Sequence, residues 1–462
     1  MNSAPANDAQ SSHALRYPAP RKLGLLPLVC VMYLVVSGGA YGLEDAVRQA
    51  GPRLTILLCL VVPLTLSLPT ALMAAELTAL MPVEGGFYFW VKEALGPFAG
   101  FCEAYLTILY TAVDMAIYPV LFASYLSFIV PLGATAQVAI GIALVWLAGG
   151  LNLLGVRPVG ITSIILSAIL VSPFAALVIL GFPHLIHFQM PTQPLFGADA
   201  WGALAGGLTV VIWNFGGWEN LSAVSAEIEN PRRNYLRAVL IAMPIIVAGY
   251  LLPLAVSVSG ASSGADWGVG SFAREGKLIG GPILGGALAI GGAVMSFAVF
   301  EAAMLWVSRM PFILAREHYL PASLTRLWSA TVTPTRSILL CCVVFTLLVP
   351  VGFVALVVLD VFFYMAALAL EMLALVKLRQ LMPNRTGMFT IGGGKLGLAL
   401  VATLPVLTWL ATFGLAVSTS GGKLDFILAI ALGLCVWPAY ANCSRRYGGP
   451  PAIDPPPTSI TA

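Results

Sequence analysis

Two long apolar stretches of this chain are each interrupted by a Gly-Gly pair that an aromatic residue and a carboxylate follow. The first interruption reads Ser37-Gly38-Gly39-Ala40-Tyr41-Gly42-Leu43-Glu44, and the second reads Asn214-Phe215-Gly216-Gly217-Trp218-Glu219-Asn220. Glycine weakens a helix, so each pair favours a break that frees backbone N–H and C=O groups. In hydrocarbon such groups are tolerated only where they line a cavity enclosed by protein. A matched pair of breaks therefore points to the binding site of a transporter.

The charges deep within the apolar stretches are acidic. Asp114 lies midway along one stretch, Glu219 follows the second break, and Glu301 lies inside a third. Each such residue costs about 3 kcal/mol to insert into a membrane and usually has a function. Without a nearby base, these acids must be protonated, hydrated or bound to a cation. This favours a cationic substrate, a carried proton, or both, and makes all three acids candidates for proton coupling.

Asp114 lies on one helical face with hydroxyl-bearing side chains. Thr107, Tyr110, Asp114 and Tyr118 follow one another at helical spacing. A carboxylate flanked by phenols can hold an ammonium group by charge, hydrogen bonds and aromatic faces. The alternative is a protonated Asp114 that is hydrogen-bonded to a neighbouring helix.

Each of the other deep acids also has a structural alternative. Glu219 can bind substrate or cap the half-helix that follows it, because carboxylates are favoured at a helix N-terminus. Glu301 can carry a proton, contact substrate or make a structural hydrogen bond. Glu103 is interpreted as a gate or structural group, and Glu371 as a structural group that faces the basic residues Lys377 and Arg379. Glu44 is expected either to line an outer vestibule or to be solvated.

The predicted substrate site combines the two breaks with the residues beside them. Trp213 and Trp218 flank the second break, where an aromatic ring can cover a bound substrate. The rival explanation for a Gly-Gly pair is close packing of helices. The predicted substrate-binding residues are Ser37, Gly38, Gly39, Tyr41, Tyr110, Asp114, Tyr118, Trp213, Asn214, Gly216, Gly217, Trp218, Glu219 and Glu301.

Composition identifies an integral membrane protein. The 462 residues are 59% hydrophobic and 9% charged, and the mean hydropathy is +0.93. No soluble domain has this balance. The sequence predicts an all-α protein with about twelve transmembrane helices. The expected spans are 23–48, 53–80, 98–129, 134–154, 158–183, 201–228, 235–258, 283–312, 336–352, 354–379, 397–418 and 424–443.

The distribution of Lys and Arg predicts the orientation in the membrane. With the N-terminus in the cytoplasm, 18 of the 23 basic residues face inward. This positive-inside bias, with an even number of spans, places both termini in the cytoplasm of a cell (plasma) membrane protein. The tails 1–22 and 447–462 are expected to be disordered, and the first helix to be an uncleaved anchor.

Several functional classes are excluded. The seven cysteines lack metal-type spacing, the four histidines form no cluster, and no phosphate loop is present, so we expect no metal, no cofactor and no enzyme activity. The net charge of +3 gives no reason to expect nucleic acid. A channel or a non-transporting nutrient sensor remains a remote alternative. The sequence leaves open an accessory chain.

The positions of the breaks suggest internal symmetry. They lie in the first and sixth spans, so spans one to five and six to ten are predicted to form a five-plus-five inverted repeat. The transporter domain 23–446 then contains one repeat at about 23–183, a second at about 200–380, and two extra helices at about 397–443. The binding site is expected between the repeats.

Two motifs resemble the amino acid–polyamine–organocation superfamily. Ala75-Glu76-Leu77 through Pro82-Val83-Glu84-Gly85-Gly86-Phe87-Tyr88 resembles its loop after span two. Glu227-Ile228-Glu229-Asn230-Pro231-Arg232-Arg233 resembles its signature after span six. The resemblance covers about 22–445.

Within this superfamily the chain most resembles the polyamine-uptake branch of plants and protozoan parasites. The residues that carry this likeness are Val36-Ser37-Gly38-Gly39, Tyr41-Gly42-Leu43-Glu44-Asp45, Asp114, Tyr118-Pro119-Val120-Leu121-Phe122, Trp213-Asn214, Trp218-Glu219, Glu301, Leu370-Glu371 and Lys377-Leu378-Arg379. The resemblance implies the inverted-repeat fold, proton-coupled import, and a position near substrate for Asp114, Trp218 and Glu301. Two residues depart from the pattern. Leu236 stands where the family often has Pro, and Glu219 stands where the plant branch commonly has Asp.

Two substrates remain open. A polyamine lacks a carboxylate and needs acids at both ends, which fits the acidic deep charges. An amino acid would place its carboxylate on the N–H groups of Ser37–Gly39 and its ammonium group on carbonyls of the breaks. Proton coupling is preferred to sodium coupling, although a sodium site made of carbonyls and hydroxyls would leave no trace in the sequence.

Overall fold

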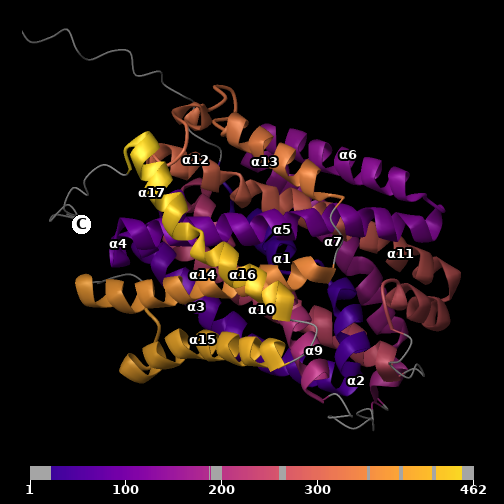
Figure 1. The fold of residues 1–462 in the computed structure, drawn as a ribbon. Helices are drawn as coiled ribbons and strands as arrows, with labels where there is room; N and C mark the ends of the chain where they lie inside the picture. The colour runs from indigo at the N-terminus through magenta and orange to yellow at the C-terminus, as the bar shows by residue number, and fades with distance from the viewer. Residues whose placement is uncertain are drawn as a thin grey trace, which may run out of the picture.

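The protein is a bundle of long apolar helices, as a computed structural model of the chain shows. The structure describes residues 22–186, 188, 200–259, 267–350, 354–383, 389–418 and 423–449. Most of both predicted tails therefore lies outside the described residues. Long helices such as α5, α6 and α15 run in roughly the same direction across the view in Figure 1, at different levels of the bundle. Among the described residues, eight helices are long and apolar enough to cross a membrane.

The helices follow the predicted order of spans. The α-helices are α1 Leu25–Val36, α2 Leu43–Val62, α3 Leu68–Leu80, α4 Gly86–Leu95, α5 Pro97–Ile129, α6 Ala134–Leu153, α7 Val156–Leu180, α8 Phe182–Ile186, α9 Ala200–Phe215, α10 Pro231–Ser259, α11 Ser271–Val307, α12 Arg309–Arg316, α13 Thr335–Leu348, α14 Val354–Leu381, α15 Gly394–Ser418, α16 Lys423–Leu434 and α17 Val436–Tyr447. Shorter helical turns are η1 Ala40–Gly42, η2 Pro63–Ser67, η3 Asn220–Glu227 and η5 Ala322–Thr325.

Both predicted helix breaks are confirmed. The first span consists of α1, a non-helical link at 37–39, η1 and the beginning of α2. The sixth span consists of α9, a link at 216–219, and η3. The helices α2 and α11 also change direction, at Gly51 and Gly281, where the glycine has a positive φ and proline follows it.

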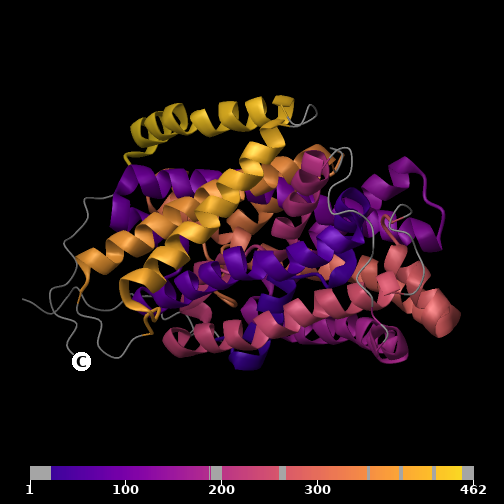
Figure 2. The ribbon, with the colours of Figure 1, turned by 90° about the horizontal axis from the view of Figure 1, so that it is seen from below.

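The broken segments lie in the middle of the bundle. Helix α1 packs against α7, α10 and α11, and α9 packs against α2. Helix α5 packs lengthwise against both α11 and α14. In Figure 2 the yellow helices α16 and α17 lie along the upper edge of the bundle, and the golden α15 crosses its near face. Helices α15 and α16 contact α14. This arrangement encloses the two breaks within protein.

Candidate functional site

The first break is held open by its glycines. After α1 ends at Val36, Ser37 is extended and Gly39 has a φ of +78°, a conformation that side chains other than glycine rarely adopt. The Gly39 N–H donates to the Ser37 hydroxyl at 3.2 Å. A Cβ atom on Gly38 would lie 2.5 Å from the side chain of Met295 on α11. The glycines thus allow the backbone to approach α11 closely.

The second break has its freed backbone groups bonded by side chains. Gly217 has a φ of +88°, and its N–H donates to the Tyr364 hydroxyl of α14 at 2.8 Å. The Tyr250 hydroxyl of α10 donates to the Asn214 carbonyl at 2.8 Å. Because its neighbours bond these groups, this break offers a substrate fewer free backbone groups than its sequence predicts.

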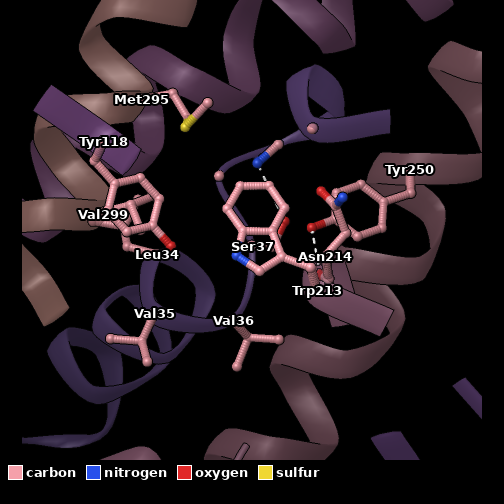
Figure 3. Close-up of a pocket in the computed structure, with 13 residues that line it drawn as sticks. Leu34, Val35, Val36, Ser37, Tyr118, Trp213, Asn214, Tyr250, Met295 and Val299 are labelled. Carbon is pink, nitrogen blue, oxygen red and sulfur yellow. Dashed lines mark hydrogen bonds between the residues drawn. The ribbon is translucent and has the colours of Figure 1, made fainter. Parts of the chain in front are cut away.

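A cavity lies between the two breaks. Its volume is about 30 Å³, which is enough for about one or two water molecules. In Figure 3 the Trp213 indole lies across its centre, with Tyr118 on one side and Asn214 and Tyr250 on the other. The lining residues are Leu34, Val35, Val36, Ser37, Gly38, Gly39, Gly42, Tyr118, Trp213, Asn214, Tyr250, Met295 and Val299.

Asp114 is bonded to two aromatic residues of the cavity wall. The Trp213 indole N–H and the Tyr118 hydroxyl each donate to its carboxylate at 3.0 Å. The two rings are stacked, with centroids 6.1 Å apart. A partly buried carboxylate therefore lies directly behind the cavity wall, hydrogen-bonded to two of the wall's side chains. An ammonium group in the cavity could replace either donor.

Six of the predicted site residues line the cavity. They are Ser37, Gly38, Gly39, Tyr118, Trp213 and Asn214. The other predicted residues lie outside this lining. Tyr41 donates to the Leu288 carbonyl, Tyr110 donates to Asn220, and the buried Trp218 donates to the Phe215 carbonyl. Gly216 packs against Tyr364.

The two remaining predicted acids make hydrogen bonds of their own. The Glu219 carboxylate accepts from the Tyr364 hydroxyl at 3.3 Å and makes no capping bond to η3, so its side chain does not act as a helix cap. The Glu301 carboxylate accepts from Thr162 on α7 at 2.7 Å, and its second oxygen has no partner. Both acids are buried.

Three residues near the cavity were missed from the sequence. Asp360 on α14 is 5% exposed and interacts electrostatically with Asp114. Its signal was available, because it interrupts the apolar run Leu359–Val361. Tyr364 follows it by one helical turn. Tyr250 had no such signal, since a tyrosine in a span predicts nothing about its position.

The bundle is closed on both sides of the cavity. At one end, which we call the basic end, buried ion pairs join different helices, as in Arg309–Glu227 at 2.6 Å and Arg379–Glu76 at 2.5 Å. At the opposite end, the buried Glu44 accepts from the N–H groups of Gly270 and Phe272 at the start of α11. The expectation of a solvated Glu44 is therefore wrong, because the carboxylate caps α11.

The described residues contain no group of three His, Cys, Asp or Glu side chains that could hold a metal ion. The site thus consists of a small cavity, a backbone break on each side, and acids behind its wall. Such a site can bind and release a small molecule, and it has no arrangement of nucleophile and base for a reaction.

Comparisons with known proteins agree with this geometry. The family model described as amino acid permease matches residues 23–436. A probable polyamine transporter of Arabidopsis thaliana is 31% identical over 440 residues, which cover 94% of this chain and 89% of the relative. A polyamine transporter of Oryza sativa subsp. japonica, PUT1, is 32% identical over 431 residues, which cover 92% of this chain and 80% of the relative.

A solved structure shows the same fold. The crystal structure of MhsT in complex with L-phenylalanine superposes with a TM-score of 0.62 and covers 87% of this chain and 99% of that chain at 13% identity. The inverted-repeat fold with two broken helices is thereby confirmed. The chain belongs to the amino acid permease family, within the amino acid–polyamine–organocation superfamily, and is a transporter rather than an enzyme.

Proposed function

We propose that the protein imports a small amine, with a polyamine favoured, by alternating access coupled to protons. The observation that carries this proposal is Asp114, a partly buried acid with no ion-pair partner among the described residues, directly behind the cavity wall formed by Trp213 and Tyr118. A carboxylate behind stacked aromatic rings suits an ammonium group, which can bond the acid and contact the ring faces. The similarity to plant polyamine transporters supports this choice.

The substrate enters a site that must first expand. The cavity of about 30 Å³ is too small for a diamine. Rotation of the Trp213 side chain breaks its bond to Asp114 and enlarges the cavity on the side of the second break. An ammonium group then takes the position of the indole N–H. In this scheme Trp213 covers the acid in the empty state and the substrate in the loaded state.

The proposed binding residues are the fourteen named from the sequence, and they take different roles. The six that line the cavity contact the substrate, and Asp114 supplies the charge. Asp114, Glu219 and Glu301 are the candidates for proton coupling, because none of them has an ion-pair partner among the described residues. Glu219 and Glu301 are buried, and Asp114 is partly buried. Sodium coupling is the alternative.

The second candidate function is an amino acid permease. It is favoured by the backbone at 37–39, which lines the cavity and can offer the Gly38 N–H to a carboxylate. The Ser37 N–H already donates to the Tyr33 carbonyl, and the Gly39 N–H donates to the Ser37 hydroxyl. The two functions differ in one chemical requirement, since only an amino acid brings an anion to the first break. The family is compatible with both.

Location follows from the charge distribution. We propose that the protein lies in the plasma membrane with both termini and the basic end in the cytoplasm. The ion pairs of the basic end then close the inner side of the pathway. In this orientation, import begins from the end at which Glu44 caps α11.

Uptake by purified protein in proteoliposomes tests the proposal. Labelled putrescine, spermidine and several amino acids are offered under an imposed proton or sodium gradient. We expect a proton gradient to drive putrescine or spermidine uptake. Uptake of amino acids that polyamines do not inhibit would refute the favoured substrate, and uptake that responds only to sodium would refute proton coupling.

A further inference from the structure

Helices α5 and α14 form an antiparallel ladder of matched side chains. Asp114 interacts electrostatically with Asp360, and one level further along, the rings of Tyr110 and Tyr364 meet with centroids 5.5 Å apart. About two helical turns beyond Tyr110, Glu103 of α5 interacts electrostatically with Glu371 of α14. Each rung joins one residue of α5 to one of α14. The last rung lies about 16 Å from Asp114 along α5, toward the basic end.

The Glu103–Glu371 rung is buried and incompletely bonded. Glu103 is 0% and Glu371 is 3% exposed. One oxygen of Glu103 accepts from Thr107 at 3.3 Å, while its other oxygen and one oxygen of Glu371 have no hydrogen-bond partner. Glu219, which is 1% exposed, interacts electrostatically with both. Three buried carboxyl groups thus interact electrostatically, and two of them carry an oxygen without a hydrogen-bond partner among the described residues.

No base faces this cluster among the described residues. The titratable side chains that do face it are Tyr110, Tyr364, Tyr235 and Cys102. Bases on neighbouring helices have other partners: Lys92 pairs with Glu317, Arg379 with Glu76, Arg309 with Glu227 and Arg316 with Glu84. Other charged side chains lie on α14 and on elements packed against α5 and α14, and none of them pairs with Glu103 or Glu371 among the described residues. They are Glu93, Arg274, Glu275, Lys277, Glu301, Arg336, Lys377, Lys395, Arg445 and Arg446.

Three buried carboxyl groups without a base cannot all be ionised, because each added charge is repelled by the others and lacks solvent. They must bind either a cation or protons. The described residues do not place three such side chains as metal ligands, so protons are the ligand that this geometry suits. An unpartnered carboxyl oxygen is the position that a shared proton occupies.

We propose that Glu103 and Glu371, together with Glu219, form the proton-binding site of the transport cycle, separate from the cavity that holds the substrate. This inference rests on the proposed proton-coupled function. It changes the interpretation of Glu103 and Glu371, for which the sequence favoured structural roles. It also gives Glu219 a route to the substrate site.

The route runs through Tyr364. Its hydroxyl accepts from the Gly217 N–H of the second break and donates to the Glu219 carboxylate. When Glu219 takes a proton from the Glu103–Glu371 rung, it no longer needs the Tyr364 donor. The hydroxyl is then free to reorient, and the hydrogen bond that anchors Gly217 changes with it. Proton binding at the rung thereby acts on the backbone next to the cavity.

Two transport assays on the same proteoliposomes test the inference. Uptake driven by a proton gradient requires coupling, whereas exchange of labelled for unlabelled substrate at equal pH does not. We expect Glu103→Gln and Glu371→Gln each to lower gradient-driven uptake by about tenfold or more, with exchange retained. The partly exposed Glu93 on α4 provides the control, and Glu93→Gln should leave both assays unchanged.

The outcomes separate this inference from the proposed function. If wild-type protein exchanges neither a polyamine nor an amino acid, the proposed function fails. If wild-type protein is coupled and both Gln variants keep full gradient-driven uptake, the proton site is refuted.

An infrared measurement covers the case in which a Gln variant folds poorly. We expect the band of protonated carboxyl groups in the wild-type spectrum to lose intensity in Glu103→Asp, Glu371→Asp or Glu371→Gln protein, or to shift in frequency. An identical band in every folded variant would also overturn the inference.

Discussion

The acids at the basic end and the acids between α5 and α14 are equally buried in several cases but have opposite environments. Glu76 is 1% exposed and accepts three hydrogen bonds, two from Arg379 and one from the Ile391 N–H. Glu371 is 3% exposed and has no base. Burial alone therefore does not distinguish a structural acid from a functional one, whereas the presence of a base does.

This difference has a physical reason. A buried acid with a bidentate arginine regains most of the solvation it loses, and it joins two helices in one geometry. A buried acid without a base keeps the free-energy cost of its lost solvation. Such an acid is therefore expected where a ligand or a proton supplies the missing partner. The first kind suits a closed gate, and the second kind suits a site that loads and unloads.

Removal of the Asp114 charge should have the largest effect. Asp114→Asn keeps the size of the side chain but leaves an ammonium group without its counter-charge. We expect amine uptake in proteoliposomes to fall at least about 30-fold. The melting temperature should change little, because the amide oxygen of asparagine can still accept a hydrogen bond from Trp213 or Tyr118.

Asp45→Asn is the matched control. Asp45 forms a partly exposed pair with Arg48, which contributes little, so uptake should be unchanged. Unchanged polyamine uptake by Asp114→Asn would remove Asp114 from the site.

Gly38→Ala should have the next largest effect, because it fills the cavity. Its Cβ atom would meet Met295 at 2.5 Å and Val299 at 3.2 Å. Displacement of these side chains costs about 1–3 kcal/mol. A cost of about 1.4 kcal/mol, near the lower end of this range, lowers uptake about tenfold. Gly249→Ala on α10, where a Cβ atom meets nothing within 4 Å, should leave uptake unchanged. Equal uptake by both variants would contradict the position of the cavity.

Glu76→Gln tests the paired acids. It leaves the guanidinium group of Arg379, which is 17% exposed, without its carboxylate. We expect a loss of about 3–5 kcal/mol in the free energy of unfolding, measured as a lower melting temperature in detergent. A double-mutant cycle with Arg379→Met checks the cause. If the two single losses simply add, the pair is not coupled.

The sequence predicted the fold well because its signals are local. Each apolar run indicates its own helix, and each Gly-Gly pair indicates a break at its own position. It placed Ser37, Gly38 and Asn214 at the cavity for the same reason, since a break exposes its own residues. Trp218 illustrates the limit. Its neighbour Trp213 reaches the cavity, while Trp218 turns into the core, and only the exact path of the link at 216–219 decides between them.

Pairing between distant segments was the other limit. Glu76 and Glu371 are both acids near the end of an apolar span, and nothing in either span tells which will meet an arginine. Arg379 is 303 residues away from Glu76 in sequence, and Glu371 is 268 residues away from Glu103. Such partners come from tertiary packing, which the pattern of one chain does not encode at single-residue resolution.

Asp360→Asn provides the contrast to Glu76→Gln. Asp360 has an oxygen without a hydrogen-bond partner, and its electrostatic neighbour is another acid. Removal of the Asp360 charge should therefore keep or raise the melting temperature. Uptake should fall by a few-fold at most, because one negative group near the ammonium group is lost. A melting temperature that drops as far as in Glu76→Gln would show that an unpaired acid is structural, and the distinction between the two regions would fail.

Glu84 gives the smallest and most specific prediction. Burial raises the pKa of the Glu84 carboxyl, although Arg309 and Arg316 partly offset the rise and Glu227 adds to it. A folded-state pKa above the unfolded value means that Glu84 contributes stability at low pH, and that this contribution is lost as pH rises through the folded pKa. Glu84→Gln protein should therefore match wild type in acid and gain stability relative to it, by less than about 1 kcal/mol, at higher pH. Melting temperatures of both proteins, from below the unfolded-state pKa of Glu84 to above its raised folded-state pKa, measure the difference. A loss of stability at higher pH instead would mean that the ion pair with Arg316, 3.5 Å away, outweighs the burial of Glu84.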